Sequence, residues 1–171
     1  GNLMGPPIYR ACKKDADVYV MANDKNLLLA YGAFQGAGFK LHNVLAWDKG
    51  SPTANRWYMK HLEYTLYLWK GHGRAIANAG SKQLFREPRP KNKIHPTQKP
   101  VPLLAHYITN STQIGGMVLD PFMGSGSTLI AAAQCDRQSI GIEVDAARFD
   151  AACTRVEKAV AEIGTSAGVA I

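Results

Sequence analysis

The chain has 171 residues and a formal net charge of +7, and 46% of its residues are hydrophobic. These values are typical of one soluble globular domain with a buried core. They exclude a membrane span, because no apolar run approaches roughly 18 residues, and no signal peptide is visible. Cys12, Cys135 and Cys153 lack paired spacing, which argues against a disulfide framework or a metal site and predicts a reduced, cytoplasmic protein.

Hydrophobic spacing divides the first part of the chain into alternating helices and strands. Helices are expected at residues 4–14 and 25–36, and strands at 18–21, 39–47 and 61–69. The second helix would turn Leu28, Leu29 and Phe34 inward. In the last strand, the residues from Tyr64 to Trp69 alternate in the manner of a half-buried strand.

Residues 48–60 are expected to form a loop that is both polar and aromatic. Arg56 and Trp57 are its candidate contacts to DNA or to a target base. The alternative is that these aromatics only attach the loop to the core. Glu63 is interpreted as a residue that orients Arg56 or the hairpin.

Residues 71–93 show neither the helical nor the strand period, so a long loop is expected there. Between residues 72 and 99 lie seven lysines and arginines but one acid, Glu87, which leaves +6 of the total charge in this segment. Such a cluster suits a phosphate backbone, and the alternative is a solvated loop. The candidate DNA-binding residues of the chain are Arg56, Trp57, Lys82, Arg86, Arg89, Lys91 and Lys93.

Prolines at positions 100 and 102 suit the first turn of a helix, whose apolar face would carry Leu103, Leu104, Tyr107 and Ile108. Near the end of the chain, residues 146–163 are predicted to form a last helix. Its inward face would carry Phe149, Cys153, Val156 and Val160. The tail from Gly164 consists of small residues and is expected to fray.

The stretch 115–143 combines a strand, a glycine-containing loop, a helix and a second strand. Residues 117–119 are an apolar run that predicts a buried strand ending in Asp120. A turn with Gly124 and Gly126 precedes a predicted helix at 128–135, and a strand at 139–142 ends in Glu143. This order is typical of a nucleotide-type cofactor site on an open α/β sheet.

The composition of this loop distinguishes between cofactors. Ser125-Gly126-Ser127 lacks the lysine of a triphosphate-binding loop, and the third glycine of the dinucleotide fingerprint is also missing. Glu143 follows Asp120 by 23 residues, near the roughly 20-residue offset at which an acid meets a ribose hydroxyl. Asp120 suits a cationic amino group. These features predict S-adenosylmethionine, and the alternative is an ordinary strand–turn–helix with two surface acids.

Two motifs resemble those of one enzyme family. The segment from Asp120 to Thr128, DPFMGSGST, resembles the cofactor loop D-P-F-x-G-S-G-T-T of the N6-adenine/N4-cytosine DNA methyltransferases. The segment from His95 to Pro100 matches that family's H-P-T-Q-K-P letter for letter. The motif order is that of the permuted class, in which the catalytic half precedes the cofactor loop. The resemblance covers roughly residues 8–158.

The resemblance implies a Rossmann-like α/β methyltransferase fold, with a mostly parallel sheet in which the strand at 61–69 is antiparallel. It implies methyl transfer from S-adenosylmethionine to an exocyclic amino group of a base flipped out of double-stranded DNA, as in restriction–modification systems. Adenine N6 is favoured over cytosine N4, no metal is required, and homodimers are common. The implied cofactor-binding residues are Asp120, Pro121, Phe122, Gly124, Ser125, Gly126, Ser127, Glu143, Thr97 and Lys99.

The family's catalytic tetrapeptide, D-P-P-Y or S-P-P-Y, is not found in the chain. Gly5-Pro6-Pro7-Ile8 is the nearest string, but it lacks the polar first residue and the aromatic. The resemblance therefore predicts the C-terminal three quarters of a methyltransferase, left by cloning, by proteolysis or by truncation of a gene such as a prophage remnant. A remnant that binds cofactor or DNA without methyl transfer is one alternative, and a methyltransferase acting on RNA or protein is another.

Overall fold

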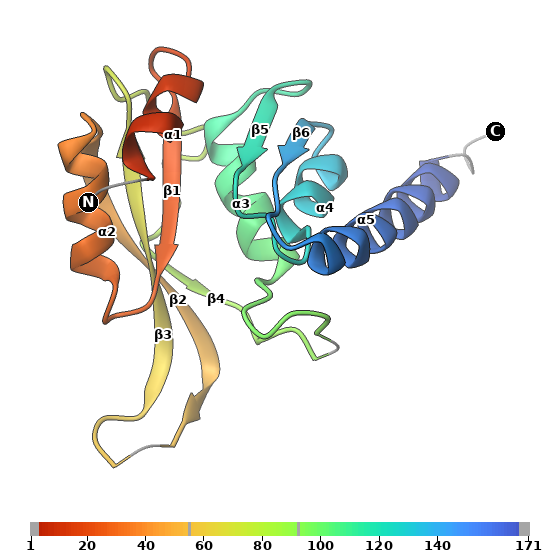
Figure 1. The fold of residues 1–171 in the computed structure, drawn as a ribbon, viewed down its shortest axis with the longest axis horizontal. Coiled ribbons are helices and arrows are strands. Elements are labelled where there is room, and N and C mark those ends of the chain that lie inside the picture. Colours follow the sequence, from red (N-terminus) through yellow and green to blue (C-terminus); the bar gives the residue numbers. More distant parts are fainter. Residues whose placement is uncertain (1–3, 55, 92, 168–171) are drawn as a thin grey trace. The chain divides into compact units, whose positions relative to one another are not determined.

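A computed structural model describes residues 4–54, 56–91 and 93–167, except for the side chains of 165–167, and shows two compact units (Figure 1). The first unit is Gly1–Pro88 and the second is Arg89–Ile171. The single methyltransferase domain expected from the sequence stays a prediction. Within the described ranges, no helix is long and apolar enough to cross a bilayer.

The first unit contains one mixed sheet and two helices. Its elements are α1 (Gly5–Ala11), β1 (Asp17–Ala22), α2 (Leu27–Gly36), β2 (Lys40–Thr53), β3 (Lys60–Trp69) and β4 (Leu84–Arg86). The strand order is β1-β3-β2-β4. Among these described strands β3 runs antiparallel to β1 and β2, whereas β4 runs parallel to β2. This confirms the prediction that the strand at 61–69 opposes an otherwise parallel sheet.

The core of the first unit lies between the sheet and its helices. Phe34 of α2, Phe39 and the β3 residues Leu66 and Leu68 form a buried cluster. The predicted inward face of α2 is partly wrong, because Leu28 and Leu29 are 79% and 75% exposed. Leu27, Ala30 and Tyr31 contact the core instead. Two adjacent leucines point about 100° apart on a helix, so spacing alone left the orientation of α2 undecided.

The prediction of a half-buried strand at 64–69 is also wrong. The four consecutive residues Thr65–Leu68 of β3 are buried, and β3 is flanked by β1 and β2 in the sheet. An inner strand of a sheet can bury successive residues, so alternation along the sequence does not settle which side chains are exposed.

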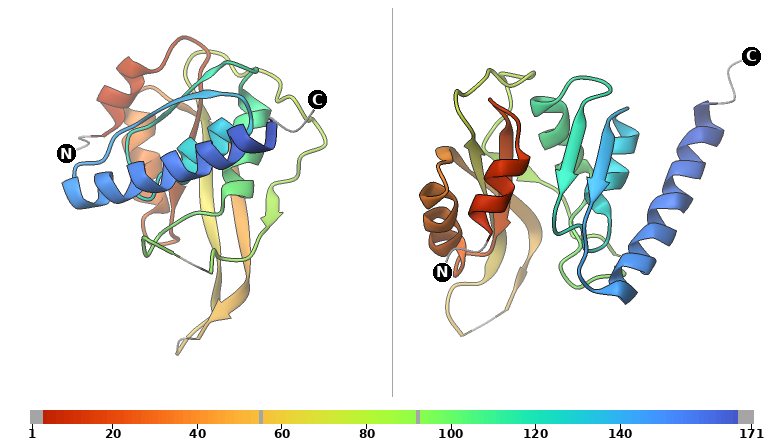
Figure 2. Two further views of the ribbon diagram at one scale, coloured as in Figure 1. Left: turned by 90° about the vertical axis from the view of Figure 1, so that its right-hand side faces the viewer. Right: turned by 45° about the horizontal axis from the view of Figure 1, so that its top comes forward.

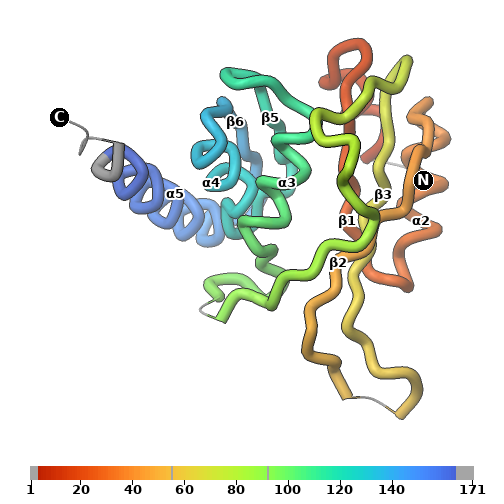
Figure 3. Tube along the Cα trace, turned by 180° about the vertical axis from the view of Figure 1, so that it is seen from behind, coloured from red at the N-terminus to blue at the C-terminus, as the bar shows by residue number. Residues whose placement is uncertain are grey.

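The predicted loop at 48–60 is mostly an extension of a hairpin. β2 continues to Thr53, and Thr53 pairs with Lys60 after a register irregularity that begins at Asp48. β1 pairs with β3 no further than Tyr64, and β4 pairs with β2 no further than Asp48. The end of the β2–β3 hairpin therefore projects as a two-stranded ribbon beyond the rest of this sheet (Figures 1 and 3).

The predicted loop at 71–93 contains one short strand that periodicity could not reveal. Three residues, Leu84–Arg86, pair as β4 with Ala46, Trp47 and Asp48. The Trp47 indole Nε1 donates to the carbonyl oxygen of Glu87 at 2.7 Å, just after this strand. A strand of three residues is too short for an alternating pattern of apolar and polar residues to be recognised.

The second unit contains a parallel strand pair and three helices. Its elements are α3 (Val101–Ser111), β5 (Met117–Asp120), α4 (Ser127–Gln134), β6 (Gln138–Gly141) and α5 (Ala146–Ala167). β5 and β6 pair in parallel, α3 packs against α4, and α4 contacts both strands and α5 (Figure 2). Leu103, Leu104, Tyr107 and Ile108 of α3 are buried, as predicted.

Three expectations for the second unit need correction. β5 is not fully buried, because α4 covers one face and leaves Met117 54% exposed on the other. In α5, Phe149 and Val160 are 42% and 45% exposed, whereas Ala152 is fully buried. α5 also runs to Ala167, past the expected start of the tail, and residues 168–171 lie outside the described residues.

The string Gly5-Pro6-Pro7-Ile8 lies in α1 of the first unit. Its prolines occupy the first turn of that helix, where a missing backbone N–H costs nothing. The string is therefore a helix start and not a motif at the end of a strand.

Candidate functional site

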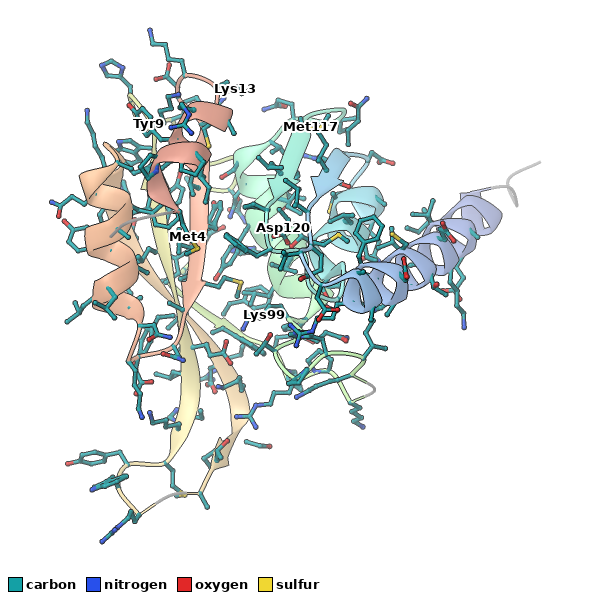
Figure 4. The ribbon with its side chains drawn as sticks, viewed as in Figure 1. Met4, Tyr9, Lys13, Lys99, Met117 and Asp120 are labelled. Atoms are coloured by element: carbon teal, nitrogen blue, oxygen red, sulfur yellow. The ribbon has the colours of Figure 1, made fainter. Side chains whose placement is uncertain are left out.

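The carboxyl ends of β5 and β6 bring the two predicted acids to one edge of the second unit. Asp120 ends β5 and is paired in register with Gly141, two residues before Glu143. Figure 4 shows Asp120 at the opposite end of β5 from Met117. Lys99 lies toward the Asp120 end of the strand in this view. In open α/β sheets, ligands bind beyond the carboxyl ends of the strands.

The glycine loop, residues 121–127, turns sharply between β5 and α4. Asp120 Oδ1 accepts a hydrogen bond from Phe122 N at 3.0 Å. This side-chain bond to the backbone two residues further on stabilises the start of the turn. Gly124 and Gly126 have φ values of +51° and +72°. Gly126 is the left-handed N-cap of α4, so this helix begins from a backbone conformation that favours glycine.

Glu143 directly contacts the glycine loop. Its Oε2 accepts a hydrogen bond from Gly124 N at 3.1 Å, and its Oε1 accepts one from Asp145 N at 3.1 Å. The structure therefore brings together the acid and the glycine that the sequence placed 19 residues apart. A carboxylate can accept about four hydrogen bonds, so acceptor capacity is left for ligand hydroxyls.

The side chains of the loop point to two sides. Phe122 is 61% exposed, whereas Ser125 and Ser127 are 5% and 4% exposed. The two serine hydroxyl oxygens lie 3.2 Å apart in the interior. The hydroxyl groups of Ser125 and Ser127 are therefore not available to a ligand, and at these two positions a ligand could contact only the backbone.

Met123, which is buried, and Arg155, which is half-buried, lie near the loop and carried no functional signal in the sequence. Met123 is 5% exposed, and a Cβ on Gly141 would lie 2.4 Å from its Sδ. Arg155 of α5 donates from Nη1 to the Ser125 carbonyl oxygen at 2.6 Å and to Ser127 Oγ at 3.1 Å. Burial lowers the pKa of the Arg155 guanidinium from its usual range.

The segment from His95 to Pro100 folds as a turn stabilised by its own side chains. His95 Nδ1 lies 3.2 Å from Thr97 N, which donates to it, and 2.9 Å from Thr97 Oγ1. Gln98 is buried, and its Oε1 accepts a hydrogen bond from Ile94 N at 3.1 Å. Thr97 is exposed and Lys99 is half-buried.

A cavity of about 190 Å³ joins this turn to the glycine loop. It is lined by His95 of the turn, by Gly124 and Ser125 of the loop, and by Arg148 of α5. Thr97, Lys99, Asp120 and Glu143 do not line this cavity. His95 opens the H-P-T-Q-K-P segment but is not among the cofactor-binding residues that the resemblance implies, and nothing in the sequence pointed to Arg148.

The candidate DNA-binding residues are distributed over both units. Arg56 and Trp57 lie at the exposed hairpin tip, where the Arg56 guanidinium is 5.5 Å from the Trp57 ring centroid. Arg86 lies on β4, and its Nε is 3.3 Å from Asp48 Oδ2. Of the remaining candidates, Lys82 is an exposed residue of the first unit, and Arg89, Lys91 and Lys93 begin the second.

Glu63 forms a cross-strand ion pair within the hairpin. Lys49 Nζ donates to Glu63 Oε1 at 3.2 Å and lies 5.8 Å from the Trp47 ring centroid. Lys49 is only 8% exposed. A buried lysine needs such a partner, so Glu63 contributes to the shape of the hairpin. The burial of Lys49 could not be expected from the sequence, because a lysine in a polar segment gives no sign of burial.

Comparisons with known proteins agree on one family. The family model described as DNA methylase matches residues 7–153. A Type II methyltransferase of Moraxella bovis, M2.MboI, is 30% identical over 151 residues, which cover 77% of this chain and 55% of that protein. The chain thus spans little more than half of that relative.

Solved structures show the same fold. The crystal structure of an M1.HpyAVI–SAM complex matches with a TM-score of 0.73 and 26% identity, over 84% of this chain and 76% of that one. The PvuII DNA methyltransferase, described as cytosine-N4-specific, matches with a TM-score of 0.75 at 16% identity, over 92% of this chain and 73% of that one. The Rossmann-like methyltransferase fold expected from the sequence is therefore confirmed.

Proposed function

This chain belongs to the N6-adenine/N4-cytosine DNA methyltransferase family, and on that basis we propose that it binds S-adenosylmethionine and serves methyl transfer to DNA. The observation that carries the proposal is the convergence of Asp120, the glycine loop and Glu143 at the carboxyl ends of β5 and β6. The acceptor would be an exocyclic amino group of a flipped base in double-stranded DNA.

The donor and acceptor groups present fit this cofactor. Glu143, whose carboxylate already lies against the loop, would accept hydrogen bonds from the two ribose hydroxyls. Asp120 would attract the cationic amino group of the methionine part, while Thr97 and Lys99 would contact its carboxylate. The exposed Phe122 ring offers a packing surface for the adenine or the methionine arm. When bound, S-adenosylmethionine supplies an electrophilic methyl group on a sulfonium.

DNA would be held by the two sets of candidate residues. The exposed Arg56 and Trp57 would contact bases or sugars from the hairpin tip. Lys82, Arg86, Arg89, Lys91 and Lys93 would contact phosphates, which position the duplex without reading its sequence. Family likeness favours adenine N6 as the acceptor, with cytosine N4 as the alternative. The homodimer stays a prediction.

A second candidate function rests on the sequence itself. Because no D-P-P-Y tetrapeptide occurs in the 171 residues, a protein that binds cofactor or DNA without methyl transfer is the alternative. A methyl-transfer assay on duplex DNA decides between the two. The chain is assayed alone and after addition of the catalytic segment of a relative. Transfer only in the second case would support the enzyme, and no transfer in either case would support the binding protein.

Calorimetric titration of the 171-residue chain with S-adenosylmethionine tests the cofactor site. We expect measurable binding, weakened at least several-fold in Asp120→Ala because one carboxylate of the site is removed. Asp150→Ala is the matched control, since it removes an exposed carboxylate of α5 from the same unit. Binding that survives Asp120→Ala unchanged would contradict the assignment of the glycine loop.

A further inference from the structure

Arg155 of α5 makes hydrogen bonds to the inner side of the glycine loop. Arg155 Nη1 donates to the carbonyl oxygen of Ser125 and to the hydroxyl of Ser127, at 2.6 and 3.1 Å. Ser127 Oγ in turn lies 3.2 Å from Ser125 Oγ. One guanidinium therefore contacts both residues that flank Gly126, and through them it reaches the start of α4.

Close packing of α5 on the same glycine accompanies these hydrogen bonds. A Cβ on Gly126 would lie 2.6 Å from Val156 Cγ2 and 3.5 Å from the carbonyl oxygen of Ala152. Ala152 is completely buried. The loop therefore lies against the helix surface between Ala152 and Val156.

The polar groups that Arg155 satisfies are buried. Ser125 and Ser127 are 5% and 4% exposed, so water has little access to their acceptors. Without the guanidinium, the Ser125 carbonyl would lose a charge-assisted hydrogen bond and keep its desolvation cost. The loop would then relieve that cost by moving toward solvent.

We propose that Arg155 is a positioning residue that holds the glycine loop in its ligand-binding shape before the cofactor arrives. This inference rests on the proposed function, in which the glycine loop forms part of the S-adenosylmethionine site. A loop already fixed by Arg155 loses less conformational freedom on binding, so its affinity for the cofactor is higher. Arg155 contacts the inner side of the loop through the buried serines.

Two measurements on Arg155→Met test the inference. Methionine is unbranched like the stem of arginine and packs in a half-buried place, but it donates no hydrogen bond. Hydrogen–deuterium exchange without cofactor should show residues 122–128 exchanging about tenfold faster, while β5 keeps its rate. Calorimetric titration with S-adenosylmethionine should show about tenfold weaker binding. Lys158→Met, which removes an exposed cation from the same helix, should change neither quantity.

The two readouts separate the inference from the function on which it rests. If the unmodified chain does not bind S-adenosylmethionine but Arg155→Met still loosens the loop, the proposed function fails and the positioning of the loop holds. If exchange and affinity are both unchanged in Arg155→Met, the inference is overturned. Faster exchange throughout the second unit would also overturn it, because Arg155 would then stabilise the unit as a whole. Arg155→Lys should recover part of the affinity, since its ammonium can still donate to the Ser125 carbonyl.

Discussion

Gly126 is excluded from bearing a side chain for two separate reasons. Its φ of +72° is strained for other residues, and a Cβ there would meet Val156 Cγ2 at 2.6 Å. We expect Gly126→Ala to lower the free energy of unfolding of the second unit by about 2 kcal/mol, from backbone strain and overpacking. Urea denaturation followed by circular dichroism measures this change.

Gly32→Ala is the matched control for that prediction. Gly32 lies inside α2, and a Cβ there would have no heavy atom within 4 Å. Alanine in a helix interior is about 0.5–1 kcal/mol more favourable than glycine, so this variant should be slightly more stable. Equal effects of the two substitutions would show that Gly126 is not constrained as described.

His106 makes the stability of the second unit depend on pH. This residue of α3 is half-buried, its Nε2 lies 3.5 Å from Asn110 Nδ2, and burial lowers its pKa below that of a free histidine. The unfolded chain therefore takes up this proton at a higher pH than the folded chain does. The stability contribution is complete above about pH 6.5 and is lost as the pH falls through the lowered pKa.

We expect His106→Gln to flatten this decline in the free energy of unfolding below about pH 6.5. Urea denaturation at a series of pH values measures it. His61→Gln removes an exposed imidazole from the first unit and controls for the loss of a histidine. A decline that remains unchanged in His106→Gln would assign the pH dependence to other groups.

At the scale of elements, the end of the β2–β3 hairpin is the feature most suited to contact a disturbed duplex. Trp57 and Tyr58 are 79% and 95% exposed there. Residues 50–62 contain Arg56 and Lys60 but no acid, and Lys60 is paired with Asp24 at 2.7 Å, so Arg56 is the cation of this ribbon that best complements DNA. A two-stranded ribbon fits the major groove, and stacking of one aromatic ring on a base contributes about 1–3 kcal/mol.

Binding to a duplex with an abasic site tests the role of this tip. We expect the chain to prefer the abasic duplex over the intact one by several-fold, because an exposed ring can occupy the gap in the stack. Trp57→Ala should remove the preference, as measured by fluorescence anisotropy. Lys93→Ala should weaken binding to both duplexes equally. If Trp57→Ala did the same, Trp57 would be an ordinary surface contact.

Elements with strong local signals were predictable, and their orientation often was not. The prolines near the start of α3 and the glycines around α4 locate these helices within a few residues. The exposure of Leu28 and the burial of Lys49 depend on which neighbours α2 and β2 pack against. Because adjacent side chains on an element differ in direction, local pattern does not settle such cases.

At the scale of the whole molecule, the positive charge of residues 72–99 is only partly available to DNA. Arg86 is 3.3 Å from Asp48 Oδ2, and Arg74 is 4.0 Å from Asp17 Oδ2. These two cations are therefore partly neutralised by the first unit itself. Lys91 and Lys93 are exposed residues of the second unit.

The salt dependence of DNA binding should reveal this difference. A plot of log affinity against log salt between about 50 and 200 mM loses about one unit of slope for each phosphate contact removed. We expect Lys93→Ala to lower the slope by about one unit, and Arg86→Ala to lower it by less. Equal changes would mean that Asp48 does not compete with phosphate for Arg86.

The site was more predictable than the contacts that hold it. Asp120, the loop glycines and Glu143 follow one another in the sequence, and parallel strands bring their carboxyl ends together, so their meeting could be expected. Arg155 lies 30 residues beyond Ser125 on a helix with several other charged residues. Which of these charged residues faces the glycine loop is decided by the way α5 packs, and the sequence does not show this.

The ribbon formed by the end of β2 and β3 has a consequence for how such a protein changes over time. Thr53 pairs with Lys60 beyond the last pairs made by β1 and β4, so the side chains at the turn do not share the packing of the sheet. Substitutions at Trp57 or Tyr58 are thereby uncoupled from the core. Evolution or a randomised library can vary this tip with little loss of fold, and a new target preference can arise there one residue at a time.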